Sequence, residues 1–136
     1  MISSLLYVSQ SLLTPANEEA EVASIVTVAR SRNLGLRITG VLISTVAGFA
    51  QILEGSTSAI DELMISIHRD PRHTNIRVLT YGPIERRRFA VWSLGYSGPS
   101  SYLAARVKPL LNDPNAVGAA SQMERLARLM SEFAGR

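Results

Sequence analysis

The segment LRITGVLISTVAGFAQILEG, residues 36–55, decides the fold of this chain. Its two apolar, β-branched runs at 36–45 and 48–55 meet across a short link at 46–48, a pattern that predicts an antiparallel hairpin. One residue of the second run, Gln51, is polar although its neighbours look like core residues. Burying a side-chain amide is costly unless both its oxygen and its NH₂ group find partners. The hairpin therefore predicts a polar site in the middle of an apolar strand.

Both sides of the hairpin show helical periodicity. Before it, a helix is expected from about residue 16 to residue 32. Four apolar residues lie on one face of that helix: Val22, Ile25, Val26 and Ala29. After the hairpin, four apolar residues again recur at helical spacing: Ile60, Leu63, Met64 and Ile67. Ser58 and Asp61 resemble a capping box at the start of this second helix, and Pro71 ends it.

Three more segments have the composition of strands: 3–11, 75–84 and 88–97. The order of elements up to this point is β-α-β-β-α-β-β. This order predicts an α+β, ferredoxin-like fold, in which two helices pack on one face of a mixed sheet. We expect this domain to occupy residues 1–98, with a helical extension at 99–136.

The extension contains two helical segments. A short one is expected around 102–111, interrupted by Pro109, and a longer one follows Pro114. The longer segment carries an apolar stripe of four residues: Met123, Leu126, Met130 and Phe133. Short amphipathic helices are not stable alone, so we expect these two to cover the second face of the sheet or to bind a partner.

The composition is that of a globular chain. Of its 136 residues, 46% are hydrophobic and 18% are charged. The absence of cysteine excludes disulfides and thiolate catalysis, and with only two histidines we expect no metal site. The N-terminus lacks the features of a signal peptide, and no apolar run approaches the roughly 20 residues that span a bilayer. We therefore expect a cytoplasmic chain with no membrane contact.

A net charge of +3 raises the question of nucleic-acid binding. The basic residues are mostly scattered, and the one run, ERRR at 85–88, has no aromatic residues around it on which bases could stack. We interpret this run as a solvated turn and expect no nucleic-acid partner.

Three polar residues are predicted to lie near one another. Tyr7 shares a strand face with Leu5, Gln51 lies on the third strand, and Asn33 lies where the apolar stripe of the first helix ends. Each residue also has an ordinary structural explanation. Tyr7 could be a core tyrosine whose hydroxyl reaches solvent, Gln51 an edge-strand residue and Asn33 a helix C-cap. Together, a phenol and an amide could form a hydrogen-bonded pair in a dry pocket.

Five motifs, in order along the chain, resemble those of the BLUF family of flavin-binding blue-light sensors. They are YVS (7–9), RNLGLRITGVL (32–42), FAQILEG (49–55), RDPRH (69–73) and RRFAVWSLGY (87–96). The resemblance runs from about residue 3 to residue 98. The short chain with two C-terminal helices looks like the stand-alone members of the family, which carry no fused output enzyme.

The resemblance implies the roles of the photochemical residues. Tyr7 would give an electron and a proton to the photoexcited flavin, and Gln51 would bridge Tyr7 to the flavin edge. Trp92 and Leu94 would relay the change along the last strand. Leu94 stands where methionine is usual, and leucine lacks the flexible thioether, so its coupling to Gln51 is the point where this chain departs from the pattern.

The resemblance also implies a flavin-binding set. Ile25 would form part of the apolar wall, Arg32 would lie beside the ring, and Asn33 would hydrogen-bond the pyrimidine edge. Asp70 and Arg72 would bind the ribityl-phosphate portion. The cofactor expected is FAD, although FMN or riboflavin could fill the same cleft.

The function implied is that of a blue-light sensor and not of an enzyme. The change at Gln51 would pass through the sheet to the C-terminal helices and on to a separate, unidentified signalling protein, and a homo-oligomer is expected. The main alternative is a light-independent, ferredoxin-like module that binds or hydrolyses a small molecule in the same cleft. An acylphosphatase-type site would need a loop of backbone N–H groups around phosphate, and no glycine-rich loop follows the first strand.

Overall fold

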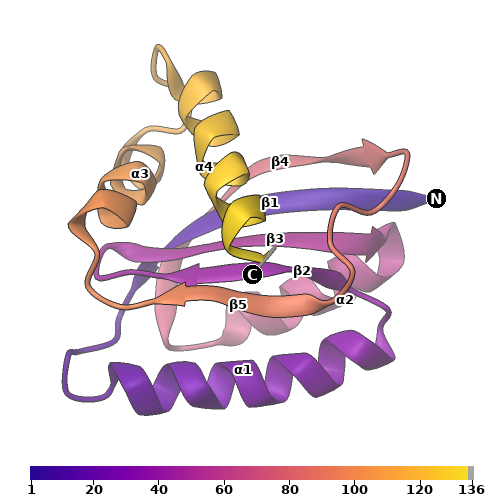
Figure 1. Cartoon of the computed structure of the whole chain (residues 1–136), viewed down its shortest axis with the longest axis horizontal. Helices are drawn as coiled ribbons and strands as arrows, with labels where there is room; N and C mark the ends of the chain where they lie inside the picture. Colours follow the sequence, from indigo (N-terminus) through magenta and orange to yellow (C-terminus); the bar gives the residue numbers. More distant parts are fainter. Residues whose placement is uncertain (135–136) are drawn as a thin grey trace.

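One five-stranded sheet organises the chain (Figure 1). The structure, a computed structural model, describes residues 1–134. Its elements in chain order are β1 (Ile2–Ser11), α1 (Glu18–Gly35), β2 (Thr39–Ser44), β3 (Gly48–Ser56), α2 (Thr57–Arg69), β4 (His73–Ile84), β5 (Trp92–Ser97), α3 (Ser101–Asn112) and α4 (Ala119–Ala134). The strand order is β4-β1-β3-β2-β5, and only the β2–β5 pair is parallel. The predicted mixed sheet of an α+β, ferredoxin-like fold is confirmed.

The predicted hairpin is the β2–β3 pair, and Thr45 organises its turn. The Thr45 hydroxyl accepts hydrogen bonds from the backbone N–H groups of Ala47 and Gly48 and donates to the Gly48 carbonyl. Gly48 also lies against β1, where a Cβ would come within 1.9 Å of the Ser9 carbonyl oxygen. Only glycine permits this approach, so the strand pairing depends on it.

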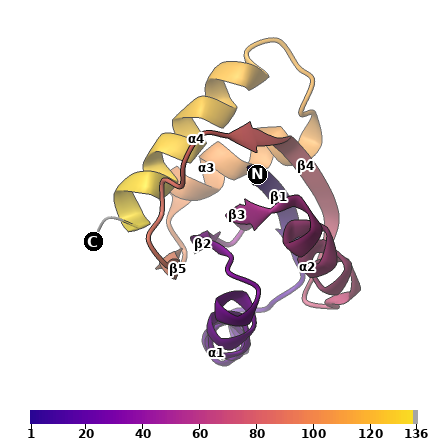
Figure 2. The ribbon, with the colours of Figure 1, turned by 90° about the vertical axis from the view of Figure 1, so that its right-hand side faces the viewer.

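The sheet has a different core on each face (Figure 2). Side chains alternate along β3, so Phe49 and Leu53 pack under α1 and α2, whereas Ala50 and Ile52 pack under α3 and α4. Both faces are therefore apolar, and every residue of β3 except Ser56 is buried. Gln51 alternates with Phe49 and Leu53, which directs it to the α1/α2 face.

The C-terminal helices cover the second face of the sheet, one of the two outcomes that their stripe predicts. In α4, Leu126 and Met130 are fully buried in the core that includes strand residues Val41 and Ile43. Residues 135–136 of the predicted extension lie outside the described part of the chain. Within residues 1–134, no helix is both long and apolar enough to cross a membrane.

Two local predictions about the helices were wrong. The N-cap of α2 is Ser56, whose hydroxyl accepts the Ala59 N–H at 3.2 Å, and Ser58 already lies inside the helix. Pro109 does not interrupt α3, which continues to Asn112. Burial of Leu110 and Leu111 beyond the proline outweighs the backbone hydrogen bond that it removes.

The prediction of a solvated turn at 85–88 holds for its first half only. Glu85 and Arg86 are exposed. The side chains of Arg87 and Arg88 instead hydrogen-bond to the sheet, with both reaching Glu54 on β3. The sequence pattern missed this because Glu54, a carboxylate inside an apolar strand, is fully buried.

Replacing Leu126 by alanine should lower the free energy of unfolding by about 2–5 kcal/mol, because a fully buried leucine leaves a cavity between α4 and the sheet. Urea unfolding of wild type and variant measures this loss. The control is Arg128→Ala on the outer side of α4, where an exposed ion pair with Glu124 should contribute less than about 1 kcal/mol. Equal losses in the two variants would show that α4 is not packed on the sheet.

Candidate functional site

Tyr7 and Gln51 are direct neighbours on β1 and β3. The Tyr7 hydroxyl donates a hydrogen bond to the Gln51 Oε1 atom at 2.6 Å, and both side chains are buried, with 3% and 5% exposed. No hydrogen bond to the amide NH₂ group of Gln51 occurs among the described residues. The predicted phenol–amide pair thus exists, with the NH₂ group of Gln51 left for another partner.

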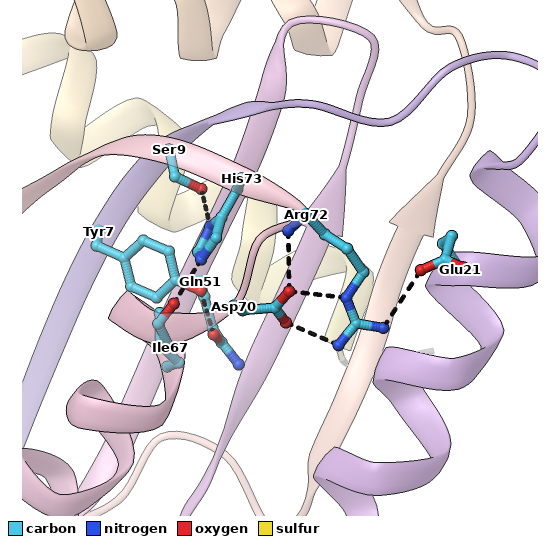
Figure 3. A network of polar contacts seen from close by, with 8 residues as sticks. All are labelled: Tyr7, Ser9, Glu21, Gln51, Ile67, Asp70, Arg72 and His73. Carbon is cyan, nitrogen blue, oxygen red and sulfur yellow. Dashed lines mark hydrogen bonds and ion pairs between the residues drawn. The ribbon is translucent and has the colours of Figure 1, made fainter.

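His73 lies beside this pair (Figure 3). Its Nε2 lies 2.7 Å from the Ile67 carbonyl oxygen, which can only accept, so Nε2 carries a hydrogen. Its Nδ1 lies 2.7 Å from the Ser9 hydroxyl, and its ring meets Tyr7 and Phe49 edge-on. His73 therefore orients the Tyr7 ring. His73 belongs to the RDPRH motif, but the motif did not predict a specific role for it.

A cavity of about 50 Å³ opens beside Gln51, between α1 and α2. It is lined by residues from both helices, from the sheet and from the loop after α2: Tyr7, Ile25, Ala29, Arg32, Leu42, Phe49, Gln51, Ser66, Ile67, Asp70, Arg72 and His73. Four of these, Arg32, Ser66, Asp70 and Arg72, also line an outer groove of about 510 Å³. The inner part is lined by both apolar and polar residues, and the outer part is charged.

Arg72 lines the cavity and lies between Asp70 and Glu21 (Figure 3). Its Nε and Nη2 atoms donate to the two Asp70 oxygens at 2.8 and 2.7 Å, and its Nη1 lies 3.7 Å from Glu21 on α1. Burial by itself would raise the pKa of the Asp70 carboxyl, but the hydrogen bonds from the Arg72 side chain and backbone outweigh it and hold that pKa below its ordinary value. The pair is ionised and rigid at neutral pH.

Asn33 is buried in α1, and both its side-chain amide atoms lack a partner within residues 1–134. The Arg32 Nε atom is also buried and unpartnered. Buried polar groups in native proteins are nearly always satisfied. Of these two residues, Arg32 lines the cavity beside Gln51, whereas Asn33 is not among the residues that line it. Asn33 does not end the helix, which continues to Gly35.

Tyr7 is held in its neutral form. Burial raises the pKa of its phenol well above the ordinary value near 10, the nearby Asp70 carboxylate raises it further, and Arg32 opposes them. A neutral phenol at this position keeps its proton directed at Gln51.

The structure does not bring Trp92 or Leu94 into this cavity. Leu94 lies in the same row of the sheet as Gln51, but Leu42 on β2 stands between them. Trp92 is paired with Gly40, is 7% exposed, and has a buried indole N–H with no partner among the described residues. The other predicted site residues, Ile25, Arg32, Asp70 and Arg72, do line the cavity.

Comparisons with known proteins agree on one family. A family model described as sensors of blue-light using FAD, BLUF, matches residues 2–95. The beta subunit of a photoactivated adenylate cyclase from Euglena longa is 35% identical over 94 residues, which is 68% of this chain and 11% of that protein. The blue light- and temperature-regulated antirepressor BluF of Escherichia coli is 30% identical over 89 residues, 65% of this chain and 22% of that protein. The chain therefore spans a small part of the length of these relatives.

Solved structures extend the similarity to the C-terminal helices. The dark-state structure of the BLUF protein BlrB has a TM-score of 0.72 and 32% sequence identity, over 99% of this chain and 97% of that one. The ground-state structure of BlsA has a TM-score of 0.71 and 27% identity, over 93% and 88% of the two chains. Both similarities include residues beyond the region matched by the family model.

Replacing Asp70 by asparagine should reduce the loss of stability in acid. Because the folded-state pKa of Asp70 is depressed, its contribution is present above its unfolded pKa, near 4, and is lost as the pH falls through the lower folded value. Urea midpoints at pH 7 and at about pH 3 should therefore differ less in Asp70→Asn than in wild type. The control is Glu62→Gln, which removes an exposed carboxylate on α2. The same acid loss in wild type and Asp70→Asn would contradict the ion-pair assignment.

Proposed function

The chain belongs to the BLUF family of flavin-binding blue-light sensors, and we propose that its flavin ring occupies the cavity beside Gln51. The observation that carries this proposal is the 2.6 Å hydrogen bond between Tyr7 and Gln51 at the wall of that cavity. The pair places an oxidisable phenol and an amide with a free NH₂ group against the ring position. We further propose residues 1–98 as the flavin-binding domain and 99–136 as its helical extension.

The polar atoms of the site suit a flavin edge. Such an edge presents acceptors and a donor, and the unpartnered amide of Asn33 and the NH₂ group of Gln51 could satisfy both kinds. Ile25, Ala29 and Leu42 give the cavity apolar walls. The residues present therefore fit the ring chemistry.

The shape requires α1 to move. The inner cavity of about 50 Å³ is smaller than the roughly 300 Å³ or more of typical ligand pockets. Of the 18 residues of α1, only Val22, Ala29 and Asn33 are buried, so this helix is the most weakly packed wall of the site. We propose that α1 and its Ile25 side chain move outward when the ring binds.

The tail of the cofactor would lie in the outer groove. Three arginines, Arg32, Arg69 and Arg72, line that groove with only two carboxylates, Glu21 and Asp70. Guanidinium groups bind phosphate oxygens through paired hydrogen bonds. This supports a cofactor with phosphates, FAD rather than riboflavin, and it assigns Arg72 and Asp70 to the phosphate side of the site.

The chain's own residues would then convert light into a changed hydrogen-bond network. A bound flavin supplies the absorption of blue light and an electron acceptor. Oxidation of the Tyr7 phenol makes its proton strongly acidic, and the 2.6 Å hydrogen bond passes that proton towards Gln51. When Tyr7 regains its electron and proton, the amide can be left in its alternative orientation or tautomer. The product is a rearranged network around Gln51.

The output is proposed to go to another protein. No bond in a substrate is formed or broken by the rearrangement, so we assign the chain no catalytic activity of its own. We propose that Trp92 and Leu94 on β5 relay the change from the site. We further propose that the chain forms a homo-oligomer and that a separate signalling protein receives the signal. The helices α3 and α4, which share a core with the far face of the sheet, are the elements positioned to respond.

Blue light should shift the visible spectrum of the flavin-loaded protein reversibly to longer wavelength. Tyr7→Phe removes the donor hydroxyl and Gln51→Leu removes the amide, so both variants should bind flavin, remain yellow and lose the normal shift. Absorption spectra in the dark and under blue light measure this. A normal shift in Tyr7→Phe would contradict the donor role, and a wild-type protein that rejects added flavin would contradict the whole proposal.

Arg72→Ala should weaken binding of FAD about 10- to 100-fold, the effect of one lost charge-assisted hydrogen bond to phosphate, while riboflavin affinity should change little. Flavin fluorescence titrations of the apoprotein with each cofactor measure both constants. The control is Arg86→Ala, an exposed arginine away from the site. Equal losses for FAD and riboflavin would show that Arg72 does not contact the phosphates.

A further inference from the structure

The connection between β4 and β5, residues 85–91, is here called the crossing segment. It joins the two opposite edges of the sheet and crosses over one face of it, near one end of β1 and β3 (Figure 1). Four strand spacings of about 4.8 Å make this distance roughly 19 Å. The eight steps from Ile84 to Trp92 reach at most about 29 Å when fully extended. The span thus takes up about two thirds of the fully extended length, so the path of the segment is set by the contacts that hold it to the sheet.

Glu54 on β3 holds the middle of the crossing segment. Its carboxylate is fully buried, and Oε1 accepts the backbone N–H groups of Arg88 at 2.9 Å and Phe89 at 3.0 Å. Its Oε2 accepts the Arg88 Nε at 3.2 Å. Since a buried carboxylate is tolerated only when it is paired and hydrogen-bonded, these contacts determine where the segment lies.

Arg87 and Arg88 extend this attachment to the neighbouring strands. Ser4, Glu54 and Thr39 form one row across β1, β3 and β2. The Arg88 Nη2 donates to the Ser4 hydroxyl, and the Arg87 Nη1 donates to the Thr39 hydroxyl and to the Glu54 carbonyl oxygen. The crossing segment is thus hydrogen-bonded to three strands along a single row.

The attachment links the strand of Gln51 to Trp92. Glu54 follows Gln51 by three residues on β3 and, by strand alternation, faces the opposite side of the sheet. Phe89, held by Glu54, is buried in the core under α3 and α4. Beyond it, the Val91 carbonyl accepts the Gly40 N–H, and Trp92 begins β5. The hydrogen bonds of Glu54, followed by the covalent backbone from Phe89 to Val91, thus connect β3 to the start of β5.

The direct route across the sheet offers the backbone ladder but no polar contact between side chains. Between Gln51 and Leu94 stands Leu42, and neither leucine side chain can form a hydrogen bond. The Trp92 indole N–H has no partner within residues 1–134 and so makes no polar contact with the Tyr7–Gln51 pair. Side-chain polar contacts therefore do not couple the site to Trp92 along this route, and the backbone ladder, in which Gly40 pairs with both Leu53 and Trp92, is the connection it offers.

We propose that Glu54 is a positioning residue that fixes the crossing segment to β3, so that a light-driven displacement of β3 at Gln51 moves the segment and Trp92 with it. This inference rests on the proposed function. It assigns the output to the face of α3 and α4, because Phe89 packs in their core, and it gives Arg87 and Arg88 a signalling role in place of surface solvation.

Trp92 is the single tryptophan of the chain, so its indole ¹⁵N–¹H resonance reports the relay without interference. The experiment compares flavin-loaded wild type and Glu54→Gln in the dark and under blue light. Glutamine keeps the shape and one acceptor but turns a donor towards Arg88 or its backbone. We expect normal flavin binding and a normal red shift, with the light-induced shift of the Trp92 resonance reduced about threefold or more.

A matched control replaces Glu85, an exposed carboxylate of the same segment, by glutamine and should leave both signals unchanged. If Glu54→Gln does not fold, Arg88→Met removes the ion pair from a side chain that is 49% exposed but keeps the two backbone N–H bonds to Glu54, so a smaller reduction is expected. A full Trp92 response in the folded variant overturns the inference, as does a wild type with a red shift but no Trp92 response. A wild type that binds flavin without a red shift overturns the proposed function, and the inference falls with it.

Discussion

The hydrogen bond between Tyr7 and Gln51 is the contact on which the arrangement of the site depends. It requires β1 and β3 to pair in one register, because a shift by one residue would turn either side chain to the other face of the sheet. That register is supported by Gly48, which alone allows β3 to approach Ser9. The apolar residues around Gln51 then leave its amide few alternative partners. Burial keeps the Tyr7 phenol protonated and directed at the amide.

The two faces of the sheet have different roles. On one face, a cavity lies between α1 and α2, and buried polar atoms of Arg32 and Asn33 have no partner within residues 1–134. Such atoms lower the stability of this face and favour the entry of a ligand. On the other face, α3 and α4 pack tightly enough to bury Leu126 and Met130 completely. Strand β3 serves both faces, with Gln51 on the first and Glu54 on the second. A sensor built this way can change its binding face without unfolding its output face.

Much of the site could be predicted because its residues are exceptions to a local pattern. Gln51 interrupts an apolar strand, and Asn33 lies where a helical stripe should be apolar. Glu54 lies in the same strand and was missed, since a carboxylate near a strand end is usually solvated. Its partners, Arg87 and Arg88, lie more than 30 residues away in a run that resembles a surface turn. His73 was missed as an orienting residue for the same reason: its contacts with Ser9 and Ile67 join three different elements.

The sequence by itself determined the order of the elements, the hairpin at 36–55 and the family, because these depend on local periodicity, turn residues and motif spacing. The family resemblance also implied that Tyr7 and Gln51 are partners, and strand alternation was consistent with this. Only the tertiary structure decided that Leu42 separates Leu94 from Gln51, that Arg72 is paired with Asp70 and Glu21, and that Glu54 holds the crossing segment. These contacts depend on which strands become neighbours and how far a connection must stretch, and neither is encoded in any local stretch of the chain.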